Sequence, residues 1–268
     1  MTHPFDQAVR LTASAEGCWR GATSPLYANM TGPFGGVTAA CLLNAVLSDR
    51  RAQGDPVSVT VNYCGAVADG AFDIEARLVR GGKYVQHWSL DLCQDGVART
   101  TASVVLGRRD AAFSHQSATP PAARPIADCT PPLGAPRLEW LNRYEFRFSE
   151  GSPARRGVDE AFHDPRSVLW LRDTPARPLD YMSLLAMSDS FILRLVHLRG
   201  APALAGTVSL TTHFLASADD IASVGTAPLL GQADATRFHR NFHDQHMQLW
   251  SADGLLLASG SQIVWFRD

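Results

Sequence analysis

The residue whose surroundings most suggest chemistry is Asp189, which lies in an apolar stretch at residues 180–195. Apolar residues recur there at helical spacing and Asp180 can cap a first turn, so the stretch predicts one helix. On that helix the residues three and four positions from Asp189 are all apolar: Leu185, Ala186, Ile192 and Leu193. An ionised carboxylate there is costly unless it is paired or hydrogen-bonded, which favours a catalytic carboxylate beside an apolar tunnel. The alternative is another helix register, with Asp189 facing solvent.

Length and composition limit the class of protein. The 268 residues are 46% hydrophobic, which is enough for one large domain or two of ordinary size. The formal net charge of -2 gives no overall attraction to nucleic acid or to an anionic membrane. No apolar run approaches the ~18 residues that would span a bilayer. Five scattered cysteines without a C-x-x-C pair, and no signal peptide, predict reduced thiols in a cytoplasmic protein.

Hydrophobic periodicity and turn residues predict the order of the elements. A nearly all-apolar helix begins in residues 33–47, and residues 108–136 hold six prolines, as is typical of a surface linker. In the first half we predict strands at residues 17–23, 57–63, 72–80, 84–92 and 97–106. In the second half we predict strands at residues 138–148, 167–172 and 208–214, with the last strands within residues 226–266.

The two sides of the linker resemble each other. V-S-V-T-V-N-Y at residues 57–63 matches V-S-L-T-T-H-F at residues 208–214, and a Gln-His pair, an Asp-Gly pair and a serine follow both in the same order. We infer an α+β chain with two copies of one unit, a long central helix wrapped by a curved antiparallel sheet. The predicted divisions are an N-terminal repeat at residues 1–109, a Pro-rich linker at 110–136 and a C-terminal repeat at 137–268.

The two copies differ at one position of the helix. Asp189 in the second copy aligns with Leu43 in the first, so only one copy carries a carboxylate. A core role shared by both copies would not need that difference, which favours a function for Asp189.

This organisation resembles the hotdog fold doubled in one chain, as in the TesB-like acyl-CoA thioesterases. The most specific matches are P-F-G-G at residues 33–36, A-M-S-D-S-F at 186–191, G-T-V-S-L at 206–210 and L-A-S-G-S-Q at 257–262. The resemblance implies an acyl-CoA hydrolase whose catalytic residues are Asp189, Thr207 and Gln262. It implies no metal and no cofactor, since coenzyme A is part of the substrate.

Hydrolysis of a thioester needs an activated water and a group that stabilises the negative charge on the carbonyl oxygen. Asp189 would deprotonate the water or attack directly, while Thr207 and Gln262 would hold the water and steer the carboxylate. Gly35 or Gly36 would supply backbone N–H groups as an oxyanion hole, worth about 3 kcal/mol per donor. Each role has a structural alternative: an ordinary strand residue for Thr207, a solvent-facing side chain for Gln262, and close packing for the glycines.

The other polar candidates have weaker signals. Asn29 would help to bind the thioester carbonyl, or would serve only as a turn residue. Three histidines invite a metal site but have no acidic or cysteine partner at matching spacing, so we predict none there: His239, His243 and His246. Three arginines could bind the phosphates of coenzyme A or could form a solvated face: Arg80, Arg108 and Arg109.

Two other functions are open at the sequence level. A hotdog enoyl-CoA hydratase or dehydratase would pair an Asp with a nearby His on its helix, whereas His197 is eight residues beyond Asp189. A non-catalytic acyl-CoA-binding protein would bind the substrate without releasing thiol. In each case the expected partner is acyl-CoA and not nucleic acid or a membrane, and we expect a homodimer or larger homo-oligomer because hotdog units usually associate further.

Overall fold

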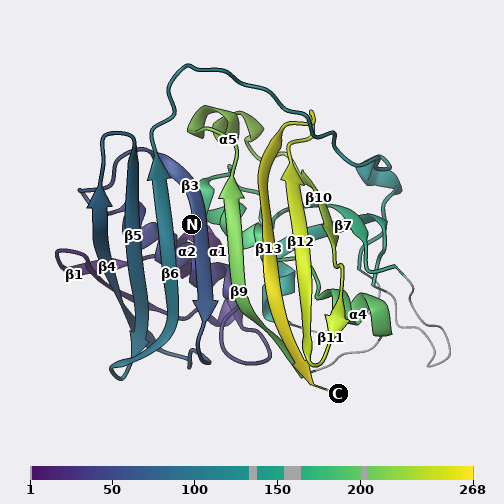
Figure 1. The fold of residues 1–268 in the computed structure, drawn as a ribbon. Coiled ribbons are helices and arrows are strands. Elements are labelled where there is room, and N and C mark those ends of the chain that lie inside the picture. The colour runs from purple at the N-terminus through teal and green to yellow at the C-terminus, as the bar shows by residue number, and fades with distance from the viewer. Residues whose placement is uncertain (1, 133–137, 154–163, 201–203, 268) are drawn as a thin grey trace.

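One antiparallel sheet forms the body of the protein, with helices behind it in the view of Figure 1. The computed structural model describes residues 2–132, 138–153, 164–200 and 204–267 of the chain. The α-helices in these residues are α1 (Pro4–Ala8), α2 (Gly35–Leu47), α3 (Tyr181–Ser188), α4 (Arg194–Arg199) and α5 (Ala218–Val224). The 3-10 helices are η1 (Pro25–Tyr27), η2 (Ile126–Asp128) and η3 (Glu139–Arg143).

The described residues place 13 strands in this sheet, each antiparallel to its neighbours. The strands are β1 (Thr12–Ala15), β2 (Cys18–Ala22), β3 (Asp55–Tyr63), β4 (Ala71–Gly81), β5 (Val85–Gln94), β6 (Val97–Gly107), β7 (Tyr144–Glu150), β8 (Ser167–Asp173), β9 (Leu204–Phe214), β10 (Leu229–Asp234), β11 (Phe238–His239), β12 (Phe242–Trp250) and β13 (Leu256–Arg267). Their order is β1-β2-β4-β5-β6-β3-β9-β13-β12-β10-β8-β7, and β11 pairs with β12.

The two halves of the sheet meet at β3 and β9. Thr60 of β3 lies opposite Thr211 of β9, and their hydroxyl oxygens are 3.1 Å apart. These threonines are equivalent positions of the predicted repeat, 151 residues apart. A residue that faces its own equivalent is what an approximate twofold axis between the two strands would produce.

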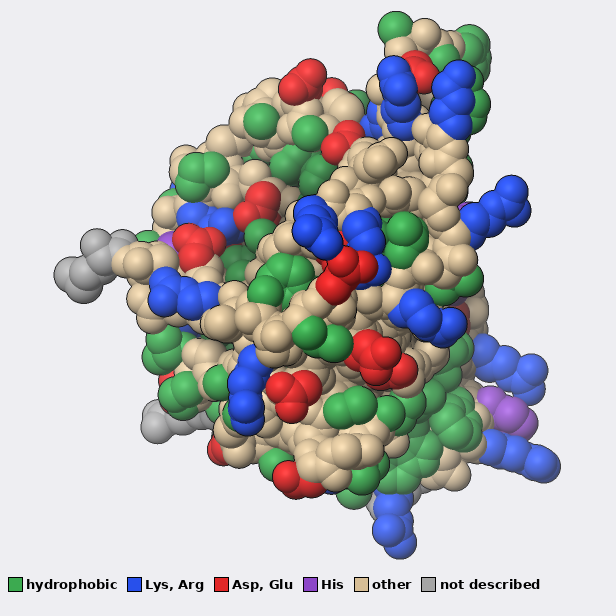
Figure 2. Space-filling model, turned by 90° about the vertical axis from the view of Figure 1, so that its left-hand side faces the viewer, with side chains coloured by type: hydrophobic (Ala, Val, Ile, Leu, Met, Phe, Trp, Pro, Cys, Tyr) green, Lys and Arg blue, Asp and Glu red, His purple; other side chains and the backbone are tan. Residues whose placement is uncertain are grey.

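The surface carries charges of both signs. On the face shown in Figure 2, Lys and Arg side chains alternate with Asp and Glu side chains, in keeping with the net charge of -2. No helix in the described residues is long and apolar enough to cross a membrane.

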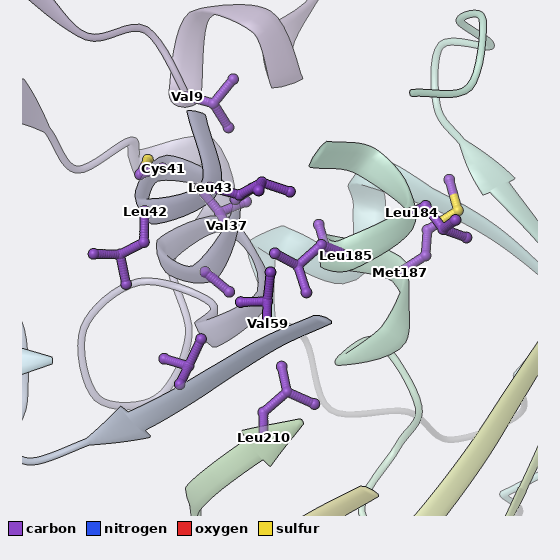
Figure 3. Close-up of a cluster of buried hydrophobic side chains, with 14 of the residues drawn as sticks. Val9, Val37, Cys41, Leu42, Leu43, Val59, Leu184, Leu185, Met187 and Leu210 are labelled. Atoms are coloured by element: carbon purple, nitrogen blue, oxygen red, sulfur yellow. The ribbon is translucent and has the colours of Figure 1, made fainter. Parts of the chain in front are cut away.

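The core forms where α2 and α3 pack against each other and against the central strands. Side chains from both helices meet above Val59 of β3 and Leu210 of β9 (Figure 3). Gly36 permits this contact, because a Cβ at that position would lie 2.5 Å from the carbonyl oxygen of Ala186 in α3. The predicted helix at residues 33–47 is confirmed as α2, and as expected it is buried nearly all round.

The predicted single helix over residues 180–195 is wrong in extent. Asp180 caps α3 as expected, by accepting a hydrogen bond from the Ser183 N–H at 2.7 Å. However, α3 stops at Ser188 and α4 is a separate helix. The hydroxyls of Ser188 and Ser190 donate to carbonyl oxygens three residues back, at 2.6 and 2.7 Å, which offers the backbone an alternative to continuing the helix. The long central helix predicted for the second copy is therefore two short helices, and Asp189 caps the first of them at its C-terminal end.

Other expectations need smaller corrections. The strand predicted at residues 138–148 begins as η3 and becomes β7 only at Tyr144, while α1 and α5 had no sequence signal that we used. The segment after β6 crosses the upper end of the sheet before it reaches η2 (Figure 1). The domain boundaries at residues 109 and 137 stay a prediction, and residue 137 lies outside the described residues.

Candidate active site

A pocket of about 490 Å³ lies where β3 ends and β9 continues. The pairing between these strands stops at Asn62 and Ser209, so the first residues of β9 extend past the end of β3. The lining of the pocket includes Asn29, Gly35, Tyr63, Asp189 and Thr207. Four of the six predicted site residues therefore lie on the wall of one pocket, although they are far apart in sequence.

Gln262 links Asp189 to Thr207. The Gln262 side chain is 1% exposed, and its amide nitrogen donates to Asp189 Oδ1 at 2.8 Å. Its amide oxygen accepts a hydrogen bond from the Thr207 hydroxyl at 3.3 Å. The threonine thereby fixes the orientation of the Gln262 amide, and the amide in turn orients the Asp189 carboxylate. Only Oδ1 of the carboxylate takes part in this series of hydrogen bonds, and Oδ2 does not.

A β-bulge turns Thr207 toward this series. In the pairing of β9 with β13, Ser209 lies opposite Ile263 and Thr207 lies opposite Val264, so Val208 is an extra residue. Strict alternation from the buried Leu210 would have placed Thr207 on the outer face of the sheet. The extra residue reverses the alternation and puts Thr207 on the inner face with Val264, next to Gln262.

The environment of Asp189 changes its acidity. Burial raises the pKa of its carboxyl from 3.8 to about 7, and hydrogen bonds with the Gly36 backbone and the Gln262 side chain lower it by less. A carboxyl with a pKa near 7 can accept and return a proton at neutral pH, as a general base must. Asp189 is half-buried and lines the pocket, so its carboxyl group is not sealed inside the core.

Two neighbours of Asp189 come from the other copy of the repeat. A Cβ at Gly35 would lie 2.7 Å from Asp189 Oδ2 and 3.0 Å from the Tyr63 hydroxyl, so both groups occupy the space that a side chain would take. The Tyr63 hydroxyl donates to the Gly35 carbonyl oxygen at 2.9 Å, which holds the first turn of α2 in place. Burial raises the pKa of Tyr63, and the charge of Asp189 raises it further.

The remaining candidates are placed as follows. Asn29 lines the pocket and also forms a turn, since its backbone N–H donates to Gly32. His243 is buried, whereas His246 bonds Asp244 at the surface, and no group of three His, Cys, Asp or Glu residues in the described chain could hold a metal. The predicted phosphate-binding arginines are absent from the described pocket lining: Arg80 is on β4, Arg108 pairs with Asp110 and Arg109 bonds the Phe214 carbonyl.

Sequence reasoning missed Tyr63 and the bulge. Tyr63 is the last residue of the strand predicted at residues 57–63, and only its position beside α2 reveals the polar role of its hydroxyl. The bulge depends on pairing with β13, more than fifty residues away, so the alternation of β9 by itself gives no signal for it.

Comparisons with known proteins give the family and the fold of the chain. The sequence matches the models of the acyl-CoA thioesterase N-terminal domain over residues 24–107 and the acyl-CoA thioesterase C-terminal domain over residues 117–266. No curated protein matches the chain.

Solved structures similar to this chain share its fold over nearly its whole length. A conserved protein of unknown function with a hot dog fold from Alicyclobacillus acidocaldarius is 38% identical, with a TM-score of 0.94, and the match covers 100% of this chain and 99% of that one. A putative thioesterase II from Thermobifida fusca is 21% identical, with a TM-score of 0.86 and coverage of 99% and 98%. An acyl-CoA thioesterase II, TesB2, from Mycobacterium marinum is 17% identical, with a TM-score of 0.76 and coverage of 98% of both chains. At the two lower identities the likeness shows the fold alone.

Proposed function

The chain belongs to the acyl-CoA thioesterase family, and we propose that it hydrolyses acyl-CoA to a free acid and coenzyme A with Asp189 as general base. The observation that carries this proposal is the hydrogen-bonded series from Thr207 through Gln262 to Asp189 at the wall of a pocket. It orients one oxygen of the carboxylate and leaves the other facing Gly35.

In the proposed reaction, Asp189 takes a proton from water as the water oxygen attacks the thioester carbonyl carbon. The resulting oxyanion collapses, the carbon–sulfur bond breaks, and the coenzyme A thiolate takes the proton back from Asp189. Gln262 touches the carboxylate directly, whereas Thr207 acts through Gln262 and is a positioning residue. General base catalysis needs only a water in contact with Oδ2, and we favour it over direct attack because burial raises the pKa of Asp189 to about 7.

The start of α2 is suited to stabilise the oxyanion. The first backbone N–H groups of a helix have no partner within the helix, and a single oxyanion-hole donor is worth about 3 kcal/mol. The Gly36 backbone bonds Asp189, so we assign the oxyanion to the Gly35 N–H, with the side chain of Asn29 as a second donor at the same pocket.

The test is the release of free thiol from short, medium, long and aromatic acyl-CoAs by the wild-type protein and by Asp189→Asn. We expect hydrolysis by the wild type for at least one chain length. The variant should stay folded by circular dichroism, still bind acyl-CoA and lose turnover by at least ~100-fold. An Asp189→Asn protein with near-normal turnover would end the assignment of the base.

The two alternatives give different results in the same assays. Hydration of crotonyl-CoA without thiol release would indicate a hydratase, but no histidine is among the described residues that line the pocket. Binding of every acyl-CoA without thiol release would indicate a binding protein.

Further parts of the proposal concern architecture and assembly. We assign the two halves of the sheet to two hotdog units, each contributing one wall of the pocket, with no resident cofactor. A homodimer or larger homo-oligomer in the cytoplasm is our expectation for the assembly, and light scattering after gel filtration measures it directly.

A further inference from the structure

A second β-bulge lies beside the pocket and carries a charged residue. In the pairing of β5 with β6, Leu92 lies opposite Thr100 and Cys93 lies opposite Ala98, so Arg99 is the extra residue. The Arg99 carbonyl oxygen accepts from the backbone N–H groups of Cys64 and Gly65, at 2.9 and 3.0 Å. Bulges of this kind redirect a side chain away from the regular alternation of the strand.

The bulge places the Arg99 guanidinium against the wall of the pocket. A Cβ at Gly65 would lie 3.8 Å from Arg99 Nη1 and 3.9 Å from its Cδ, so the side chain runs along the backbone of Gly65. Gly65 lines the pocket, two residues beyond Tyr63. The lining therefore runs from Asp189, past Tyr63, to Gly65, and the Arg99 side chain lies beside that last residue.

Arg99 has no anionic partner in the described part of the chain. Its Nε atom is buried without a hydrogen-bond partner, and no described carboxylate forms an ion pair with it. Three other partly buried arginines each bond a carboxylate at 2.7 to 3.0 Å: Arg51, Arg147 and Arg177. A guanidinium without a carboxylate partner can bind an external anion through its terminal nitrogens, and its planar fork of donors suits phosphate.

We propose that Arg99 binds a phosphate of coenzyme A while the thioester lies at Asp189, an inference that rests on the proposed hydrolysis of acyl-CoA. Asp189 is the only charged residue among those described in the lining, so the wall itself offers the anionic part of the substrate no cation. Arg99 supplies that cation at the Gly65 end, away from the reacting carbon. Arg99 is itself absent from the lining, as are the three arginines that the sequence had suggested, but its side chain lies beside Gly65, which is part of the lining.

The test compares two substrates with the same acyl group, acyl-CoA and acyl-pantetheine, which lacks the adenosine and all the phosphates of coenzyme A. For Arg99→Gln we expect KM for acyl-CoA to rise about tenfold with kcat little changed, since one charge-assisted contact of this kind is worth that factor. KM for acyl-pantetheine should stay at the wild-type value. Arg99→Lys keeps the charge but not the fork, so its KM for acyl-CoA should fall between those of the other two proteins.

Matched controls separate this site from general surface charge. Arg80→Gln removes an exposed arginine on β4, and Arg267→Gln removes one directly opposite Leu204 at the other end of the pocket. Neither change should raise KM for acyl-CoA. The proposal would be overturned if Arg99→Gln raised KM equally for acyl-CoA and acyl-pantetheine, or if Arg267→Gln raised KM for acyl-CoA more than Arg99→Gln does. A third substrate, glutaryl-pantetheine, carries a carboxylate at the end of its acyl chain and no phosphate. If Arg99→Gln raised KM for this substrate alone, Arg99 would bind that carboxylate, and the proposal would again be overturned.

The phosphate contact of Arg99 can be tested even if the protein does not hydrolyse acyl-CoA. If the wild type hydrolyses neither substrate, calorimetric binding of coenzyme A and of pantetheine still tests Arg99 on its own. Weaker binding of coenzyme A alone by Arg99→Gln would support the phosphate contact, and unchanged binding of both would refute it.

Discussion

Adding one methyl group at Gly35 should damage the site while leaving the fold intact. The new Cβ would lie 2.7 Å from Asp189 Oδ2, whereas ordinary contacts begin at 3.4 Å, so the carboxylate must move by about 0.7 Å. Misplacing a reacting group by ~1 Å can cost ~100-fold in rate. We therefore expect kcat/KM of Gly35→Ala to fall by about 10- to 100-fold, equivalent to roughly 1.4 to 2.7 kcal/mol of transition-state stabilisation.

The stability of Gly35→Ala should change little. The backbone of Gly35 is helical, where alanine is preferred over glycine by up to ~1 kcal/mol, and this gain offsets the tight contact with Tyr63. Thiol release and thermal unfolding, measured on the same preparations, separate the two effects.

Two other glycines of the region serve as controls. Gly206→Ala also changes the pocket lining, but a Cβ there has no atom within 4 Å, so both activity and stability should stay at the wild-type level. Gly36→Ala should lower the free energy of unfolding by about 1–3 kcal/mol, because its Cβ would lie 2.5 Å from a backbone oxygen of α3. Wild-type kcat/KM in Gly35→Ala would refute the placement of the Asp189 carboxylate, and a stability loss like that of Gly36→Ala would refute the separation of site from fold.

Three further predictions concern titration and the positioning of the base. The wild-type kcat/KM should rise with pH through a midpoint near 7, where Asp189 is half-ionised, and level off about one pH unit higher. Gln262→Glu places a second carboxylate beside Asp189 and should move this midpoint to higher pH. Thr207→Val should lower kcat by about tenfold, with recovery in Thr207→Ser if the hydroxyl acts by orienting Gln262 and not by packing. The Asp173 side chain is 1% exposed, and burial raises its pKa to about 7, so the stability that its protonated form contributes is full below pH 3.8 and is lost as pH rises to about 7. Asp173→Asn should therefore be more stable than wild type at pH 8 by roughly 2–4 kcal/mol. Equal pH dependence of unfolding in both proteins would contradict this.

The sequence predicted those features that depend on near neighbours along the chain. The alternation of residues 57–63 predicts β3, and Asp180 predicts the start of α3, because side-chain periodicity and capping are local. The end of α3 could not be predicted in this way. The Ser188 hydroxyl lies 2.8 Å from that of Thr212 in β9, a contact that exists only once the sheet has formed.

For the site, too, the sequence predicted which residues take part but not how they are arranged. Residue types and a family resemblance were enough to select Asp189, Thr207 and Gln262, but not to show how they touch. Their alignment depends on the bulge at Val208, and the bulge depends on which strand β9 pairs with. Arg99 and Tyr63 are unremarkable in sequence because their roles follow from a second bulge and from the end of β3.

The pocket lining takes Gly35 and Tyr63 from the part of the chain before the long crossing segment, and Asp189 and Thr207 from the part after it. Both walls thus belong to a single polypeptide, and their meeting is an intramolecular event with a high effective concentration. Diluting the protein cannot pull the walls apart. Whatever larger assembly it forms, turnover per chain should hold steady down to nanomolar protein, where a site shared between separate subunits would be lost.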